Sequence, residues 1–200
     1  MSILAGITGG IGSGKTMVCN IFARLGGAVF HADAVSRLLT DTHPELREKL
    51  SETFGSDIYT QEGLNRKHFA SVIFNDKEKL LLANSIIHPY VYEKFREWAE
   101  EHKDFPVLFM EAAILFETGA WKMFHKNILV TAPREVRIMR VMKRDGLSRQ
   151  EILARMENQS PEEDLIPYAD YVISNDGVKP LLPQVLTVWE NLLIMAEQNP

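Results

Sequence analysis

Residues 9–16, Gly-Gly-Ile-Gly-Ser-Gly-Lys-Thr, have the residue types and the spacing that bind a phosphate group. They fit the pattern G-x-x-x-x-G-K-[ST], in which glycines let backbone N–H groups surround phosphate oxygens. A helix that begins directly after the loop adds the positive end of its dipole. The positions expected to bind the nucleotide are Gly10, Ile11, Gly12, Ser13, Gly14, Lys15, Thr16 and Met17.

Two side chains at the end of this loop would carry the chemistry. We expect Lys15 to reach the β- and γ-phosphates and the hydroxyl of Thr16 to bind Mg²⁺. The alternative is a glycine-rich turn that binds nothing. A strand before the loop and a helix after it favour phosphate binding instead.

A dinucleotide site and a GTPase switch are disfavoured by the strings that the sequence lacks. Asp33 lies about 20 residues beyond the loop, where a ribose-binding acid would stand. The spacing G-x-G-x-x-G is absent, however, and Lys15 occupies the place of the third glycine. Neither D-x-x-G nor N-K-x-D, which a GTPase would carry, occurs in the chain. A kinase whose lid brings arginines to the transferred phosphoryl group is favoured.

Hydrophobic periodicity indicates the elements that would position these residues. Residues 3–8 predict a short buried strand, and a helix follows from about Thr16 to the glycine pair at 26–27. Residues 28–32 predict a second strand, so a βαβ unit and a parallel sheet are expected. Further elements are expected as strands within 106–115, 128–131 and 170–173 and a closing helix over 181–195.

The stretch from residue 33 to residue 103 differs from this pattern. It is rich in charged and helix-favouring residues, with one loop-like break over 55–63. Apolar residues at helical spacing over 80–87 and 92–98 predict helices that each have one apolar face. The fold class expected is α/β, with about five parallel strands, helices on both faces and a mainly helical insertion between the second and third strands.

Composition and charge exclude several classes of protein. The 200 residues are 46% hydrophobic and 24% charged, as in an ordinary globular protein. A net charge of −5 gives no global attraction to nucleic acid or to anionic lipid. Cys19 has no partner for an internal disulfide, and no apolar run approaches the ~18 residues of a membrane helix. We expect a cytoplasmic monomer or small homo-oligomer, without nucleic-acid or membrane partners.

Several segments in a fixed order resemble the dephospho-CoA kinase family. Residues 7–16 resemble its opening, and residues 29–38 look like its D-A-D-x-x-x-R stretch, with His31 in place of the first acid. The remaining matches are 86–89 to I-x-H-P, 115–117 to L-L-F-E, Arg155 with Gln159 to R-x-x-x-Q, and 169–177 to A-D-x-V-I-x-N-x-G. One departure is Glu111-Ala112-Ala113-Ile114, where the family usually has an acid, any residue and a proline. The matches span nearly the whole chain, so they are more specific than the loop alone.

The resemblance implies a P-loop kinase that transfers phosphate from ATP to the ribose 3′-hydroxyl of dephospho-CoA, with Mg²⁺. It implies a nucleotide-binding core over 1–35, 105–139 and 166–200, a helical acceptor domain over 36–104 and a lid over 140–165. Two other possibilities stay open: a related P-loop kinase for another nucleotide or small alcohol, and a nucleotide-binding regulator without turnover.

The resemblance also implies roles for single residues. Asp33 would be the base that accepts the hydroxyl proton, or else only a helix N-cap. Arg37 and His88 would bind the acceptor, rather than being a surface charge and a helix-terminal residue. Asn175 would contact the adenine edge.

The arginines between residues 134 and 149 differ in what is expected of them. Arg140 and Arg144 lie one helical turn apart, so the two can clamp phosphates together. We expect Arg140 on the ATP phosphates and Arg144 on the charge of the transition state. Arg134, Arg137 and Arg149 are expected to be solvated surface charges.

Overall fold

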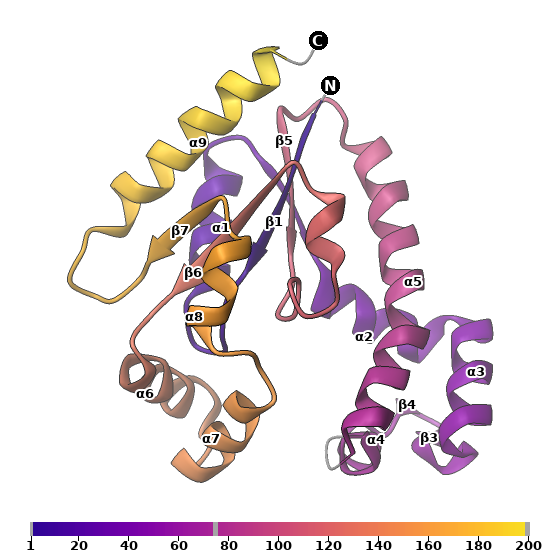
Figure 1. The fold of residues 1–200 in the computed structure, drawn as a ribbon. Helices are drawn as coiled ribbons and strands as arrows, with labels where there is room; N and C mark the ends of the chain where they lie inside the picture. Colours follow the sequence, from indigo (N-terminus) through magenta and orange to yellow (C-terminus); the bar gives the residue numbers. More distant parts are fainter. Residues whose placement is uncertain (1, 74–75, 199–200) are drawn as a thin grey trace. The chain divides into compact units, whose positions relative to one another are not determined.

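Five parallel strands form the main sheet of the computed structural model, which describes residues 2–73 and 76–198 (Figure 1). The strands are β1 (Ile3–Thr8), β2 (Ala28–His31), β5 (Val107–Glu111), β6 (Lys126–Thr131) and β7 (Tyr171–Ser174). Their order across the sheet is β2-β5-β1-β6-β7, so β1 is central. Its short run of small and β-branched residues suits a strand that is covered on both faces.

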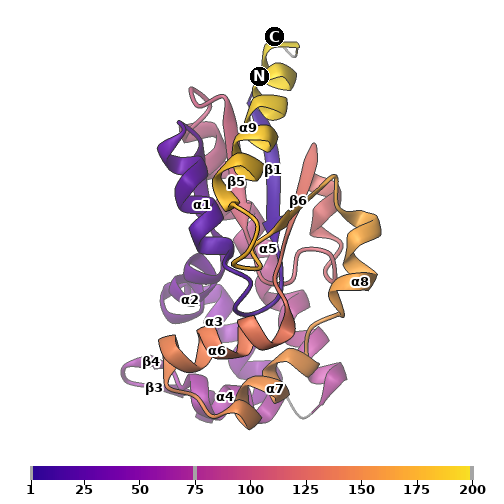
Figure 2. The ribbon, with the colours of Figure 1, turned by 90° about the vertical axis from the view of Figure 1, so that its left-hand side faces the viewer.

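Helices cover both faces of this sheet. The helical elements that accompany it are α1 (Lys15–Arg24), η2 (Ala120–Met123), α6 (Arg134–Asp145), α7 (Arg149–Glu157), α8 (Glu162–Leu165), η3 (Ile166–Tyr168) and α9 (Leu181–Gln198). On one face, Phe22 of α1 and Trp189 of α9 pack against Phe109 of β5. On the other, Leu165 of α8 packs with Leu129 of β6. Figure 2 shows α1 and α8 on opposite sides of β1 and β6, and these three layers confirm the predicted fold class.

The chain divides into two compact units. The first, which we call the sheet unit, consists of residues 2–31 and 99–198 in the described chain. The second, the helical unit, is Ala32–Trp98. Its elements are α2 (Ala32–Thr42), α3 (Pro44–Phe54), η1 (Ser56–Ile58), β3 (Tyr59–Thr60), β4 (Gly63–Leu64), α4 (Arg66–Ile73) and α5 (Lys77–Glu101), of which α5 continues into the sheet unit. The predicted assignment of a core, an acceptor domain and a lid stays a prediction.

Polar contacts join the hairpin β3–β4 to α2 inside the helical unit. The carboxylate of Asp41 accepts from the Leu64 amide at 3.1 Å and from Arg66 at 2.5 Å. The hydroxyl of Tyr59 donates to the carbonyl oxygen of Thr40 at 2.9 Å. The expected break in the helices over 55–63 is present, and long-range partners stabilise a turn of 3-10 helix and two short strands there.

Two local expectations are wrong. Residues 77–101 form the single helix α5, whereas the periodicity suggested separate helices. Pro89 lies inside it and removes one helical hydrogen bond. The buried side chains of Ile87 and Val91 continue one apolar face past the proline, so burial outweighs the lost bond.

Asp33 is in the first turn of α2 and is not its N-cap, because the helix begins at Ala32.

Among the residues that the structure describes, no helix combines the length and the apolar character needed to cross a membrane.

Candidate active site

The phosphate loop connects the carboxyl end of the central strand β1 to the amino end of α1. Gly12 has φ +79°, and a Cβ atom there would lie 2.6 Å from the carbonyl oxygen of Arg137. Gly14 has φ +95°, and its Cβ would lie 2.1 Å from the side-chain nitrogen of Asn175. Glycine is therefore required at both positions by the backbone conformation and by close neighbours. The loop has the shape that exposes backbone N–H groups to an anion.

Lys15 folds back over this loop. Its ammonium group donates to the carbonyl oxygen of Gly9 at 2.7 Å and contacts that of Gly10 at 3.4 Å. These contacts place the positive charge beside the loop amides, where phosphate oxygens would enter. The geometry therefore fits a phosphate-binding lysine, as the sequence motif predicts.

Glu111 joins the loop to the neighbouring strands. It ends β5 and pairs in register with Ile7 of β1 on one side and with His31 of β2 on the other. Its Oε1 accepts from the Thr16 hydroxyl at 3.1 Å, and its Oε2 contacts His31 Nδ1 at 2.5 Å. From the sequence, Glu111 was recognised only as part of a segment that departs from the acid-x-proline pattern of the family. An acid that ends a strand next to a phosphate-loop strand is the signal that would have assigned it to the site.

The donor set at this point suits magnesium. Thr16 and Glu111 offer hydroxyl and carboxylate oxygens 3.1 Å apart, and Mg²⁺ is held by few protein oxygens together with water and substrate phosphates. In the described part of the chain, no group of three or more His, Cys, Asp or Glu side chains could hold a metal ion.

Arg140 and Asn175 both lie at the phosphate loop. The Asn175 side-chain amide donates to the carbonyl oxygen of Ser13 at 2.8 Å, and the residue is buried. The Arg140 guanidinium contacts the same carbonyl oxygen and Asn175 Oδ1, each at 3.4 Å. The structure therefore brings three of the predicted residues together. The expected contact of Asn175 with adenine stays a prediction.

The structure does not bring Arg144 to this cluster. Its guanidinium donates to both carboxylate oxygens of Asp145 at 2.7 and 2.9 Å, and its side chain is 64% exposed. The pair lowers the pKa of the Asp145 carboxyl below its usual range and raises the pKa of Arg144. The predicted part of Arg144 in catalysis stays a prediction.

Arg137 is a residue that the sequence analysis assigned wrongly. It is not a solvated surface charge, because its side chain is only 13% exposed and pairs with Glu162 at 2.6 Å. Its guanidinium lies so close to Gly10 that a Cβ there would be 1.8 Å from Arg137 Nη1. Burial raises the pKa of the Glu162 carboxyl, although the charge of Arg137 opposes the shift. Amphipathic periodicity gives no signal for such a contact.

Gln159 connects the loop to the segment after β5. Its Oε1 accepts from the backbone N–H of Ile11 at 2.8 Å, and its Nε2 contacts the carbonyl oxygen of Ala113 at 3.5 Å. A cleft of about 760 Å³ opens beside it, at the carboxyl ends of β6 and β7. Its lining includes Thr131, Arg134, Arg137, Glu162, Ser174 and Asp176. The cleft is in the sheet unit and is large enough for a nucleoside.

The other predicted residues, Asp33, Arg37 and His88, belong to the helical unit. The carbonyl oxygen of Arg37 accepts from Arg66 at 3.0 Å. Burial lowers the pKa of the His88 imidazole, whose Nδ1 is 3.5 Å from the hydroxyl of Tyr92. The structure places Asp33 in the first turn of α2.

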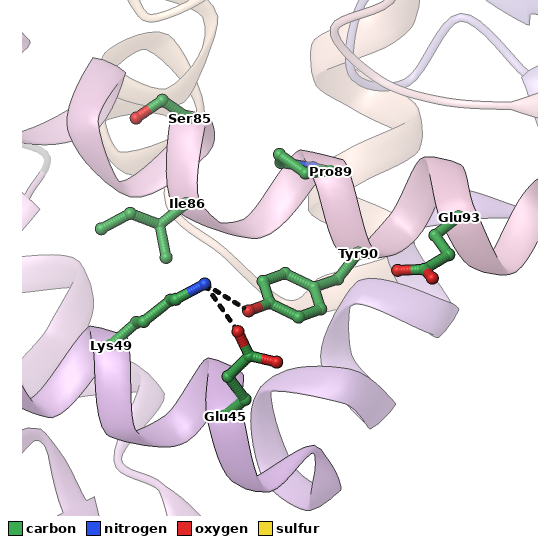
Figure 3. Close-up of a pocket in the computed structure, with 7 residues that line it drawn as sticks. All are labelled: Glu45, Lys49, Ser85, Ile86, Pro89, Tyr90 and Glu93. Carbon is green, nitrogen blue, oxygen red and sulfur yellow. Dashed lines mark hydrogen bonds and ion pairs between the residues drawn. The ribbon is translucent and has the colours of Figure 1, made fainter.

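A cavity of about 410 Å³ lies in the helical unit between α3 and α5 (Figure 3). Lys49 donates there to Glu45 at 2.8 Å and to the hydroxyl of Tyr90 at 2.9 Å. Its lining also contains Glu93, so two carboxylates and one ammonium group line the cavity. This charge balance disfavours an anionic phosphate ester, and none of the predicted site residues is in the described lining.

Comparison with known proteins agrees with these features. A family model described as dephospho-CoA kinase matches residues 3–180. A dephospho-CoA kinase of Bacteroides fragilis is 37% identical over 186 residues, which are 93% of this chain and 91% of that protein. One of Chlorobaculum tepidum is 39% identical over 207 residues, covering 98% of each chain.

Two solved structures are similar over nearly the whole chain. TT1252 from Thermus thermophilus has a TM-score of 0.78 and 34% identity over 97% of each chain. A dephospho-CoA kinase from Campylobacter jejuni has a TM-score of 0.66 and 24% identity over the full length of both chains. At the lower identity, the likeness concerns the fold alone.

Proposed function

The chain belongs to the dephospho-CoA kinase family, as its motifs suggested, and we propose from this premise that it phosphorylates the ribose 3′-hydroxyl of dephospho-CoA. ATP is the phosphoryl donor, and the products are CoA and ADP. This is the final step of CoA synthesis. The observation that carries the proposal is the phosphate loop at the carboxyl edge of the sheet, where Lys15 lies on the Gly9 carbonyl oxygen and the Thr16 hydroxyl donates to Glu111.

The phosphate loop supports binding and positioning of the ATP phosphates. On nucleotide binding, Lys15 exchanges its loop carbonyl oxygens for β- and γ-phosphate oxygens. Thr16, with Glu111 beside its hydroxyl, would hold Mg²⁺, which would supply positive charge to the ATP phosphates. The cleft at the ends of β6 and β7 would take the nucleoside, with Asn175 at its adenine edge.

Asp33 is the proposed base that orients the ribose hydroxyl and accepts its proton. A carboxylate of ordinary basicity suffices because the transition state of phosphoryl transfer is loose and the proton leaves late. Arg37 and His88 would bind the acceptor. The location of Arg37 and His88 in one compact unit, Ala32–Trp98, supports an acceptor domain.

The arginines of α6 would act on the phosphates. Arg140 already contacts the loop and would bind ATP. Arg144 would leave Asp145 and stabilise the charge that develops on the transferred group, as lid arginines do when a lid closes. We also propose a cytoplasmic monomer or small homo-oligomer, in line with a net charge of −5 and a single cysteine.

The test is ADP release by the purified protein with ATP and Mg²⁺. Dephospho-CoA is compared with adenosine, AMP, CMP and no acceptor, and the product is identified by mass. We expect a rate that depends on dephospho-CoA and forms CoA. A clear rate with a different acceptor would leave the phosphate chemistry standing and overturn the acceptor. Nucleotide binding without turnover on any acceptor would favour a regulator.

A further inference from the structure

Both oxygens of one carboxylate are engaged at the edge of the phosphate site. Glu111 Oε1 accepts from the Thr16 hydroxyl at 3.1 Å, while Oε2 lies 2.5 Å from His31 Nδ1. The glutamate is 14% exposed at its side chain and the histidine 45%. The imidazole therefore contacts one oxygen of a largely buried carboxylate whose other oxygen contacts Thr16.

The pairing of strands β2 and β5 brings His31 and Glu111 together, although the two residues are distant in the sequence. His31 and Glu111 are the last residues of β2 and β5 and are partners in the parallel register. They are 80 positions apart in the chain. Side chains of register partners project from the same face of a sheet, so each is the other's nearest neighbour across the strands.

The contact between His31 and Glu111 makes a hydrogen bond in one tautomer of the imidazole. An ionised carboxylate only accepts hydrogen bonds, so the bond forms in the tautomer that carries the hydrogen on Nδ1. His31 then acts as a donor that fixes one oxygen of Glu111. A glutamate has more rotamers to lose than a shorter acid, and two simultaneous contacts select one orientation.

We infer that His31 is a positioning residue, which holds the Glu111 carboxylate in the orientation that meets Thr16 and thereby sets the affinity of the site for Mg²⁺. The inference rests on the proposed function for the identity of the ion. An acid at position 31 would instead face Glu111 as a like charge, which destabilises a cross-strand pair. The histidine and the longer glutamate thus act as a matched pair.

Variants at position 31 test the inference. His31→Ala removes the donor, whereas the side-chain amide of His31→Asn can place an N–H near the position of Nδ1. We expect the Mg²⁺ concentration for half-maximal ADP release to rise about 10-fold in His31→Ala, with a smaller change in rate at saturating Mg²⁺. The Asn variant should restore most of the affinity. In a Glu111→Gln background, His31→Ala should have no further effect.

A matched control removes another histidine–carboxylate contact. His68 Nε2 lies 2.9 Å from Asp57 in the helical unit, and both side chains are solvent-accessible. His68→Ala should leave the Mg²⁺ dependence unchanged. A His31→Ala protein with wild-type Mg²⁺ dependence, or a His31→Asn protein as impaired as His31→Ala, would overturn the inference.

Two readouts do not need turnover. Nitrogen-15 spectra of the metal-free wild-type protein report which ring nitrogens of His31 are protonated, and an unprotonated Nδ1 overturns the inference. Calorimetric titration of Mg²⁺ into the protein with ADP gives the metal affinity directly, and it should fall about 10-fold in His31→Ala.

If the wild-type protein does not phosphorylate dephospho-CoA, the proposed function fails, while both readouts still decide whether His31 positions Glu111. Circular dichroism identifies a variant that does not fold, and the spectra of the wild type then decide.

Discussion

The side-chain amide of Asn175 donates to the carbonyl oxygen of Ser13 at 2.8 Å, and this bond ties the end of β7 to the phosphate loop. The backbone N–H of Asn175 donates to Thr131 at the end of β6, also at 2.8 Å. One residue thus connects the loop to two strands on the same side of β1. The carbonyl oxygen of Ser13 is thereby fixed at the start of the helix that follows the loop.

Replacing Asn175 with Asp should weaken ATP binding. The carboxylate would face the Ser13 carbonyl oxygen with no hydrogen to donate, so this acceptor would lose the shorter of its two hydrogen bonds. We expect a loss of about 1–3 kcal/mol in the free energy of unfolding at pH 7 and a matching loss of affinity for ATP. Urea unfolding measures the free energy of unfolding, and calorimetric titration measures the affinity for ATP. Wild-type ATP affinity in a folded Asn175→Asp protein would contradict this prediction.

Asp33→Asn should abolish turnover while ATP still binds. An amide has the shape of the carboxylate but accepts no proton, so the rate should fall by on the order of 10²–10⁴. The measurement is ADP release with dephospho-CoA, alongside ATP affinity. Asp57→Asn, an exposed acid of the same unit, serves as the control and should retain its rate. Equal rates for the two variants would remove Asp33 from the mechanism.

Arg144→Ala should reduce the rate without destabilising the protein. Its partner Asp145 is on the same helix and the arginine is 64% exposed, so its loss should cost less than about 1 kcal/mol. A group that stabilises transition-state charge should cost on the order of 10²–10³ in kcat. Arg149→Ala, which breaks the exposed pair with Glu135, is the control and should change neither quantity. A kcat for Arg144→Ala as high as that control would show that Arg144 takes no part.

Arg137→Ala should destabilise the protein more than any substitution of the exposed arginines. It leaves the largely buried Glu162 carboxylate, only 19% exposed, without its cation. Removing one member of a buried pair costs about 3–5 kcal/mol at neutral pH, and protonation of the stranded acid should restore part of this at lower pH. The additional change Glu162→Gln should recover stability at pH 7. Chemical unfolding at pH 5 and 7 checks both statements, and equal losses at the two pH values would contradict them.

Cys19 should make stability depend on alkaline pH. Burial raises the pKa of its thiol in the folded protein, and the Glu111 charge raises it further while Lys15 opposes the shift. The unfolded thiol ionises near its ordinary pKa of about 8.5. Below that pH, the contribution of the Cys19 thiol to the free energy of unfolding is fully present. It is lost as the pH rises, because only the unfolded state then releases the thiol proton.

The comparison protein for this prediction is Cys19→Ala. The stability difference between wild type and variant should shrink by about 2 kcal/mol from pH 7 to pH 10, since each pH unit beyond the unfolded pKa counts for about 1.4 kcal/mol. Other titrating groups are common to both proteins and cancel. A difference that is independent of pH would show that the folded thiol ionises normally.

Much of the sheet unit could be predicted from local sequence. The strand over 3–8 matches the structure residue for residue, and the helices after it and at the carboxyl end were placed within three residues of their observed ends. Their hydrophobic periodicities are strong, and glycines follow the strand over 3–8 and the helix after it. The helical unit was predicted less well, because the hairpin over 59–64 and the uninterrupted α5 depend on partners far away in the sequence.

The sequence by itself determined that the chain has a phosphate loop, because glycine conformations, a lysine and a threonine at fixed spacing are local properties. Only the tertiary structure decided what surrounds that loop. His31 reaches Glu111, Gln159 reaches Ile11 and Asn175 reaches Ser13 across 80 to 162 positions. Such contacts depend on strand order and register, which no local pattern encodes, and Arg137 was misassigned for the same reason. Side chains at the ends of distant parallel strands become neighbours only when the sheet has formed.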